Sequence, residues 1–225
     1  MLSKSLLDQG YCLSEVLFAA GAIDDIEHQV ARLRYQGAGT RQLLEMPWCA
    51  DLAKRMAQHE QLAPLLPLDP VAVQCTYFEK SLDQNWLVPL HQDLSIPVAE
   101  KVDHPELTGW SEKEGRYFVQ PPIAVLEQLV AVRLHIDDCG EGDGALKVVP
   151  HSHRLGRLSG AAASSARDQF GETICSVPKG AALIMRPLVL HASSKATGLS
   201  KRRILHFLYG PASLSHGLRW HHAIR

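Results

Sequence analysis

The chain has 225 residues, of which 46% are hydrophobic and 21% charged, proportions typical of a soluble globular protein with a buried core. Its formal net charge of −1 gives no field of one sign, which argues against nucleic acid as a partner. The five cysteines include no CxxC pair and are odd in number, which predicts reduced thiols and a cytoplasmic location. The pattern contains neither a signal peptide nor a continuous apolar run of membrane-spanning length, so we expect no membrane partner.

Apolar residues recur at helical spacing up to about residue 66, which predicts a mainly helical cap over residues 1–66. Ser14 precedes a helix-forming run, and Pro64 with Pro67 closes the region. The recurring positions are Ile23, Ile26, Val30 and Leu33 in one segment, and Leu52, Met56 and Ala57 in another.

From Val71 onward the hydrophobic period changes to two, which is typical of short strands separated by turns. Turn formers such as CGEGDG at 139–144 and VPKG at 177–180 separate them. The predicted strands are 71–79, 88–98, 129–137, 145–149, 173–177, 181–186, 188–193 and 203–210. Eight strands after a helical cap predict a mainly β fold, a double-stranded β-helix or cupin-like jelly roll over residues 70–210, within one domain spanning 1–225. An α/β fold is disfavoured because we find no clear helix of about 10 to 15 residues after a strand in this half.

The stretch from 99 to 122 is polar, carries Gly and Pro, and shows no long apolar period. A segment of this kind and length usually borders a functional site. We therefore predict a long functional loop or lid here.

His91 and Asp93 lie two residues apart on a predicted strand, so both side chains leave the same face of the sheet. His191 ends an apolar segment that also has strand character, and it can supply a third ligand. Two histidines and one carboxylate form the facial triad of non-heme iron oxygenases, which leaves coordination positions open. Each element alone is a weak signal, since HxD often arises by chance and a lone histidine often ends a strand without a metal.

Arg202 follows His191 by 11 residues, counted from 191 to 202, which is enough for the chain to turn and return on a neighbouring strand. A planar guanidinium holds a carboxylate through two parallel hydrogen bonds. Ser193, two residues past His191, can donate a further hydrogen bond. Arg203 is the rival, because adjacent strand residues face opposite ways. The plain alternative is that both arginines are surface charges.

Alternation within LVAVRLHIDD puts Arg133, His135 and Asp137 on one strand face. A row of charged and polar groups inside a barrel is costly unless paired or bound to a ligand. If this face points inward, these residues shape the substrate pocket; if it points outward, they are an ordinary solvated face.

The chain resembles the phytanoyl-CoA dioxygenase family of Fe(II)/2-oxoglutarate-dependent oxygenases. The matching segments are HQD at 91–93, LHIDDCGEGDGALKVVPHSHRLGRL at 134–158, and PKGAALIMRPLVLHASSKATGLSKRR at 178–203. The resemblance implies Fe(II) at His91, Asp93 and His191, with 2-oxoglutarate at Arg202 and Ser193. By the same resemblance Gln74 and Trp110 are further candidates for the cosubstrate pocket.

The resemblance also implies a reaction, in which 2-oxoglutarate and O2 are consumed, a small organic substrate is hydroxylated, and succinate and CO2 are released. The presence of Asp93 argues against halogenation, because related halogenases carry a small residue there. Family members act on acyl thioesters, amino acids and natural-product intermediates, so the family does not choose the substrate.

The chain departs from the family where Pro-Gly-Ser-His becomes Pro150, His151, Ser152 and His153, so a glycine that eases a tight turn is replaced by histidine. Two rival functions stay open. The first is a zinc or manganese hydrolase or isomerase on a cupin-like barrel, which would use His91, Asp93 and one of His151 or His153. The second is a non-catalytic binding module.

Overall fold

The computed structural model describes residues 1–35, 39–81, 84–198 and 201–225. The predicted helical cap and the third segment of the family resemblance each include a few residues outside these ranges. Every helix among the described residues is too short or too polar to cross a membrane.

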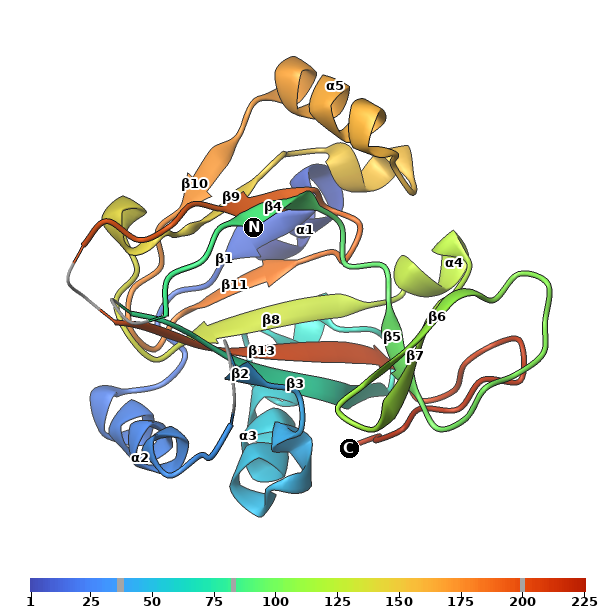
Figure 1. Cartoon of the computed structure of the whole chain (residues 1–225). Helices are drawn as coiled ribbons and strands as arrows, with labels where there is room; N and C mark the ends of the chain where they lie inside the picture. Colours follow the sequence, from blue (N-terminus) through green and yellow to red (C-terminus); the bar gives the residue numbers. More distant parts are fainter. Residues whose placement is uncertain (36–38, 82–83, 199–200) are drawn as a thin grey trace.

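Two antiparallel sheets form the centre of the molecule, and a third lies at one end (Figure 1). The six-stranded sheet has the order β1-β11-β8-β13-β3-β2, and the four-stranded sheet has the order β10-β9-β12-β4. The six strands are β1 (Tyr11–Leu13), β11 (Ala182–Met185), β8 (Val130–His135), β13 (Arg202–Pro211), β3 (Pro70–Lys80) and β2 (Gly39–Thr40). The four strands are β10 (Thr173–Cys175), β9 (Leu146–Val148), β12 (His191–Ser193) and β4 (Val88–His91). The predicted jelly roll is confirmed.

Alternation along the strands separates two cores. On β8, Val132 and Leu134 belong to the cluster that packs under the helices, whereas Ala131 belongs to the cluster between the sheets. The helices α2 (Ala20–Ala31) and α3 (Pro47–Ala57) cover the outer face of the six-stranded sheet (Figure 1). The opposite face of this sheet is therefore free to line the barrel interior.

The N-terminal region is helical as predicted, but it also gives a strand to the main sheet. The helix α1 (Leu2–Gln9) leads into β1, which pairs with β11. Ser14 does not cap a helix: its hydroxyl accepts a hydrogen bond from the Ala182 amide at 2.8 Å, and α2 begins at Ala20. Three residues are too few to show a period, which is why β1 was missed. Two short 3-10 turns, Leu43–Glu45 and Ala63–Leu65, complete the region before β3.

The prediction of a long loop at 99–122 is wrong because much of this segment forms a hairpin, although Lys113 and Phe118 of this segment do line a cavity. The strands β6 (Thr108–Lys113) and β7 (Arg116–Gln120) pair with each other, and β7 pairs with β5 (Ile96–Val98). Glu114 and Gly115 join the hairpin, both with positive φ, 52° and 75°. This is the backbone that twisted two-residue hairpin turns require, and the polar composition of the segment concealed it.

Two helices lie in the second half of the chain: α4 (Ile123–Leu126) and α5 (Gly160–Phe170). With 11 residues, α5 contradicts the expectation that this half lacks a helix of such length. Its sequence is rich in alanine, and only Ala163 and Ala166 are buried, so it has no strong apolar stripe. The sheets remain antiparallel, so the helix does not make the fold α/β. Short 3-10 turns at Glu141–Asp143 and Ser152–Leu155 flank β9.

Candidate metal centre and cosubstrate pocket

His91, Asp93 and His191 converge on one point. His91 and His191 face each other across the β4–β12 pair, and their ring centroids are 4.2 Å apart. Each histidine Nε2 lies 3.7 Å from a different carboxylate oxygen of Asp93. One ligand atom from each of the three residues lies within 4.8 Å of the others. The three predicted ligands therefore come together.

Both imidazoles are oriented for metal binding by backbone carbonyls. The Nδ1 of His91 lies 2.8 Å from the Pro89 oxygen, and the Nδ1 of His191 lies 3.0 Å from the Val189 oxygen. A neutral imidazole that donates from Nδ1 keeps the lone pair of Nε2 for a metal. The donor set and its orientation thus fit an Fe(II) ion.

Electrostatics favour the metal-binding protonation states of His191 and Asp93, whereas the Asp93 carboxylate outweighs burial and raises the pKa of His91. Burial lowers the pKa of His191 to about 4, so this ring is neutral at neutral pH. Burial would raise the pKa of Asp93, but the neighbouring His191 and His91 outweigh it and hold this pKa well below its usual range. The carboxylate is therefore ionised at neutral pH, as a ligand must be.

Gln92, between the two ligands of the HQD motif, anchors this part of the chain, and sequence reasoning assigned it no role. Its Nε2 donates to the oxygens of Gly156 and Leu188 at 2.8 and 2.7 Å. Its Oε1 accepts from the Leu158 amide at 2.9 Å. The Asp93 amide also donates to the Pro187 oxygen, at 2.9 Å. These bonds fix the segment that carries Asp93, and its central position in the motif was the available signal.

The histidines of the Pro150–His153 turn point away from the metal group. His151 has φ 67°, the left-handed conformation that the family's glycine adopts without strain. Its Nδ1 lies 2.9 Å from the Asp8 oxygen, and His153 Nε2 lies 3.3 Å from the Leu7 oxygen. Both rings therefore contact the carboxyl end of α1. Neither His151 nor His153 is therefore placed to be the third metal ligand that the alternative hydrolase would need.

Ser152 in the same turn supports the third ligand. Its hydroxyl donates to the Val149 oxygen at 2.7 Å and accepts from the Leu190 amide at 2.8 Å. Leu190 directly precedes His191, so these bonds tie the turn to the strand that carries the ligand. Ser152 is fully buried, which makes both bonds hard to replace with water.

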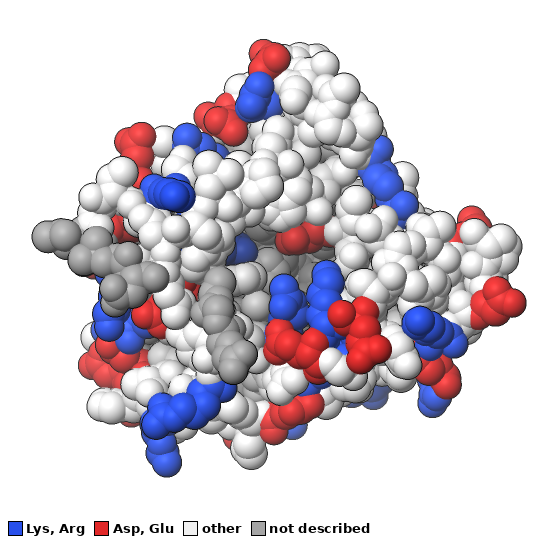
Figure 2. All heavy atoms as spheres, viewed as in Figure 1, with Lys and Arg blue, Asp and Glu red and all other residues white. Residues whose placement is uncertain are grey.

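A cavity of about 390 Å³ opens beside the three ligands. Figure 2 shows the hollow on this face, with acidic and basic side chains gathered around it. Its lining combines polar and charged side chains with apolar ones. The lining residues used below are Arg41, Gln74, Phe78, His91, Asp93, Leu94, Lys113, Phe118, Arg133, His191, Ser193, Arg202 and His206.

Of the two candidate arginines, Arg202 faces this cavity. It is 3% exposed, one Nη donates to the Gly144 oxygen, and its Nε has no hydrogen-bond partner among the described residues. Arg203 faces the other way and pairs with Asp137 and Glu27, each at 2.6 Å. A buried guanidinium with an unused donor suits the distal carboxylate of 2-oxoglutarate.

Lys80 is fully buried and contacts the lining residue Ser193, and sequence reasoning missed it. Its Nζ donates to the Ser193 hydroxyl at 2.6 Å and to the Ser194 oxygen at 2.7 Å. Burial, together with Arg202 and Arg133, lowers the pKa of Lys80 to about 8. A lysine at the end of a predicted strand is normally a solvent-exposed charge. Nothing in the sequence therefore indicated that Lys80 is buried.

The remaining predicted residues divide between the cavity and other places. Gln74 lines the cavity, and its amide donates to the Thr76 hydroxyl at 2.8 Å. Arg133 also lines it, so this end of the strand face points inward. His135 is buried and does not line the cavity, and Asp137 lies past the end of β8, paired with Arg203. Trp110, on β6, packs against the inter-sheet core and does not line the cavity.

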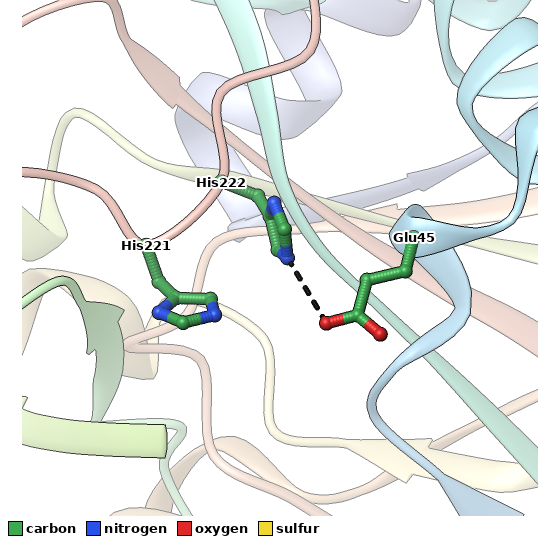
Figure 3. A group of neighbouring side chains, drawn as sticks. All are labelled: Glu45, His221 and His222. Atoms are coloured by element: carbon green, nitrogen blue, oxygen red, sulfur yellow. Dashed lines mark hydrogen bonds and ion pairs between the residues drawn. The ribbon is translucent and has the colours of Figure 1, made fainter. Parts of the chain in front are cut away.

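Two further groups of histidines and a carboxylate occur in the described part of the chain. Figure 3 shows Glu45, His221 and His222, with His222 Nε2 at 3.4 Å from the carboxylate. The same Glu45 oxygen also accepts a hydrogen bond from Arg116, whose positive charge disfavours a cation.

The other group comprises His104, Glu106 and His216. His216 Nε2 lies 3.1 Å from the Glu106 carboxylate, and His104 Nδ1 accepts from the Glu106 amide at 3.2 Å. Neither this group nor the one around Glu45 has both imidazoles oriented by carbonyls, as the cavity group has.

A jelly roll that carries two histidines and a carboxylate beside a buried arginine defines the class of mononuclear Fe(II)/2-oxoglutarate-dependent oxygenases. The family model for phytanoyl-CoA dioxygenase (PhyH) matches residues 6–204. The chain belongs to this family, and it is an Fe(II)/2-oxoglutarate-dependent oxygenase. No curated protein matches the chain.

Several solved structures share the fold at low identity. EctD from S. alaskensis, in its apo form, has a TM-score of 0.70 at 13% identity, covering 93% of this chain and 76% of EctD. The carbocyclase SnoK from nogalamycin biosynthesis has a TM-score of 0.69 at 14% identity, covering 94% and 83%. HygX from Streptomyces hygroscopicus, with nickel and 2-oxoglutarate bound, has a TM-score of 0.61 at 19% identity, covering 92% and 84%.

Proposed function

We propose that this oxygenase hydroxylates a small organic substrate at a centre held by His91, Asp93 and His191. In the proposed reaction, one oxygen atom of O2 enters a C–H bond of the substrate, and the other enters succinate as 2-oxoglutarate loses CO2. The whole chain, residues 1–225, would act as one catalytic domain. The observation that carries the proposal is the convergence of the three ligand atoms within 4.8 Å, with both imidazoles oriented by carbonyls.

The chain's own residues have separate tasks in this proposal. The two Nε2 atoms and the Asp93 carboxylate would hold Fe(II), which with 2-oxoglutarate and O2 supplies the oxidising power. Arg202 would bind the distal carboxylate of 2-oxoglutarate, and Lys80 would orient Ser193 beside it through the 2.6 Å bond. Apolar residues of the lining, such as Leu94 and Phe118, would keep water from the reacting carbon.

Structures that share the fold bear on the substrate and on the type of reaction. HygX is described with hygromycin B bound, which supports a small-molecule substrate here. SnoK is described as a carbocyclase and SnoN as an epimerase, so other oxidative outcomes occur on this fold. The buried thiols of all five cysteines support the proposed cytoplasmic location, where thiols stay reduced.

The test begins with binding under anaerobic conditions. Fe(II) plus 2-oxoglutarate should give the weak visible charge-transfer band of an iron-ketoacid chelate, and His91→Ala or Asp93→Ala should remove it together with succinate release. His28→Ala and Asp25→Ala change exposed residues of α2 and serve as matched controls. Succinate release that persists in both ligand variants would reject the assigned centre.

Product analysis then separates hydroxylation from other outcomes. A substrate panel would be screened for stimulated succinate release, and the product formed under labelled O2 would be analysed by mass spectrometry. One labelled oxygen atom in the organic product is the expected result. A product that has lost two hydrogens and gained no oxygen would replace hydroxylation with desaturation or ring closure.

A further inference from the structure

Arg133 is a buried cation that the proposed reaction leaves without a role. It lies on β8, lines the cavity and is 6% exposed. Its Nη1 lies 2.7 Å from Nδ1 of His206, and its guanidinium lies 5.6 Å from the centre of the Phe78 ring. Within the described ranges it has no carboxylate in an ion pair, and its Nε has no hydrogen-bond partner. A buried charge without an ion-pair partner costs free energy unless a bound ligand supplies the opposite charge.

The contacts of Arg133 leave one side of the guanidinium without a hydrogen-bond partner among the described residues. Nη1 is taken up by His206, whose ring is kept neutral because burial and Arg133 lower its pKa to about 3. The remaining edge, formed by Nε and Nη2, is the one that binds both oxygens of a carboxylate in parallel. Arg202 has the same arrangement, with one Nη bonded to the protein and an unused Nε.

The charges around the cavity show that one anion is not enough. Among the residues that the structure describes, the lining includes the cations Arg41, Lys113, Arg133 and Arg202 and one acidic residue, Asp93. Arg41 is paired with Glu114 at 3.0 Å. Fe(II), Asp93 and a 2-oxoglutarate dianion together leave a single negative charge, which Arg202 balances. The positive charges of Arg133 and Lys113 then have no further carboxylate to balance them among the described lining residues.

Arg133 and Arg202 are two separate cations at one cavity. Arg133 pairs in register with His206, four residues along β13 from Arg202. Burial and the positive charge of Arg202 lower the pKa of Arg133 to about 10. Each guanidinium has its own Nε without a hydrogen-bond partner among the described residues, so each can bind a carboxylate of its own.

We propose that Arg133, held by His206, binds a second carboxylate in this cavity, and that the organic substrate carries it. The inference rests on the proposed function, because it takes the site of Arg202 as occupied by 2-oxoglutarate. The metal-bound end of 2-oxoglutarate is the other source of a carboxylate, and the experiment distinguishes the two.

The test measures binding without turnover, by calorimetry on the full chain loaded with Mn(II) under anaerobic conditions. The probes are 2-oxoglutarate and then, on the 2-oxoglutarate complex, benzoate and its neutral counterpart benzamide. Benzoate should bind at least about ten-fold more tightly than benzamide, as a charge-assisted pair requires. Arg133→Met should abolish that difference and leave 2-oxoglutarate binding within about two-fold of the wild type.

Two further variants serve as controls for Arg133→Met. Arg133→Lys keeps the charge and should restore part of the preference for benzoate. Arg186→Met removes a half-buried arginine outside the cavity, whose guanidinium bonds the Glu127 and Leu129 oxygens, and should leave the preference intact. The wild-type comparison of the two probes does not depend on the folding of any variant.

Each outcome decides the inference. A loss of 2-oxoglutarate affinity of about ten-fold or more in Arg133→Met would assign the second carboxylate to the cosubstrate and overturn the substrate assignment. Equal or undetectable binding of benzoate and benzamide to the wild type, with unchanged 2-oxoglutarate affinity in the variant, would overturn the whole inference. The charge-transfer band of the wild type with Fe(II) and 2-oxoglutarate is measured in parallel. If it is absent, it is the proposed function that fails.

Discussion

Replacing Gln92 with leucine tests whether the residue between two metal ligands positions them. Its side-chain amide makes three hydrogen bonds, to Gly156, Leu188 and Leu158, and it is 8% exposed. Leucine has a similar volume and makes none of these bonds, so backbone groups in the buried segment lose their partners.

The expected loss of stability follows from the number of bonds. At about 1 kcal/mol for each bond, Gln92→Leu should lower the free energy of unfolding by about 2 to 3 kcal/mol. For a chain of this size, that corresponds to a fall in melting temperature of about 4 to 12 °C. The assay is thermal and denaturant unfolding of the metal-free protein, followed by circular dichroism.

Metal affinity gives the second measurement, because Gln92 lies between His91 and Asp93 in the chain. Loss of a group that orients a metal ligand typically weakens binding by about 10- to 100-fold, and calorimetry with Mn(II) measures this. Gln128→Leu is the matched control, since its exposed amide makes one bond, to the Ala124 oxygen at 2.8 Å. Unchanged metal affinity in a destabilised Gln92→Leu would refute the positioning role. A stability loss equal to that of the control would refute the hydrogen-bond reasoning itself.

Three further predictions concern single side chains. Arg202→Ala should weaken 2-oxoglutarate binding by about 3 kcal/mol, roughly 100-fold. Arg203→Ala should lower stability, because its ion pairs are lost, and leave 2-oxoglutarate binding nearly unchanged. Equal effects of the two variants on binding would mean that the wrong arginine was assigned. Burial lowers the pKa of His135 to about 3, so between pH 6.5 and 3 the unfolded state binds the extra proton and stability falls as the pH falls. His135→Leu should therefore reduce the acid loss by up to about 1.4 kcal/mol per pH unit, and unfolding curves at pH 7 and pH 5 that shift equally in both proteins would contradict this. His151→Val should destabilise more than His151→Asn, because a β-branched residue tolerates the observed φ of 67° poorly, and equal denaturation midpoints would show that this turn is not strained.

The strand pattern was available from the sequence because it depends on local alternation. The spacing also found His91 and Asp93, but not for the predicted reason, because β4 ends at His91 and Asp93 lies past the strand. Side chains two apart on a strand share a face, so Arg202, His206 and Leu208 on β13 all line the cavity. The same rule required Arg202 and Arg203 to face opposite ways, but it did not say which one points inward. The hydrophobic period along the chain did not reveal the 108–120 hairpin, because its turn depends on two positive φ values rather than on an apolar pattern.

The sequence by itself determined the class of fold, the HxD pair and the candidate third histidine, since these follow from residue type and spacing within short segments. Only the tertiary structure brought Lys80 to Ser193 across 113 residues, turned Arg203 toward Asp137, and placed Arg133 in the cavity with no ion-paired carboxylate in the described part of the chain. The physical reason is that alternation fixes which side chains share a face of one strand. Strand order and register decide which of those faces meet, and these arise from long-range pairing that no local segment encodes.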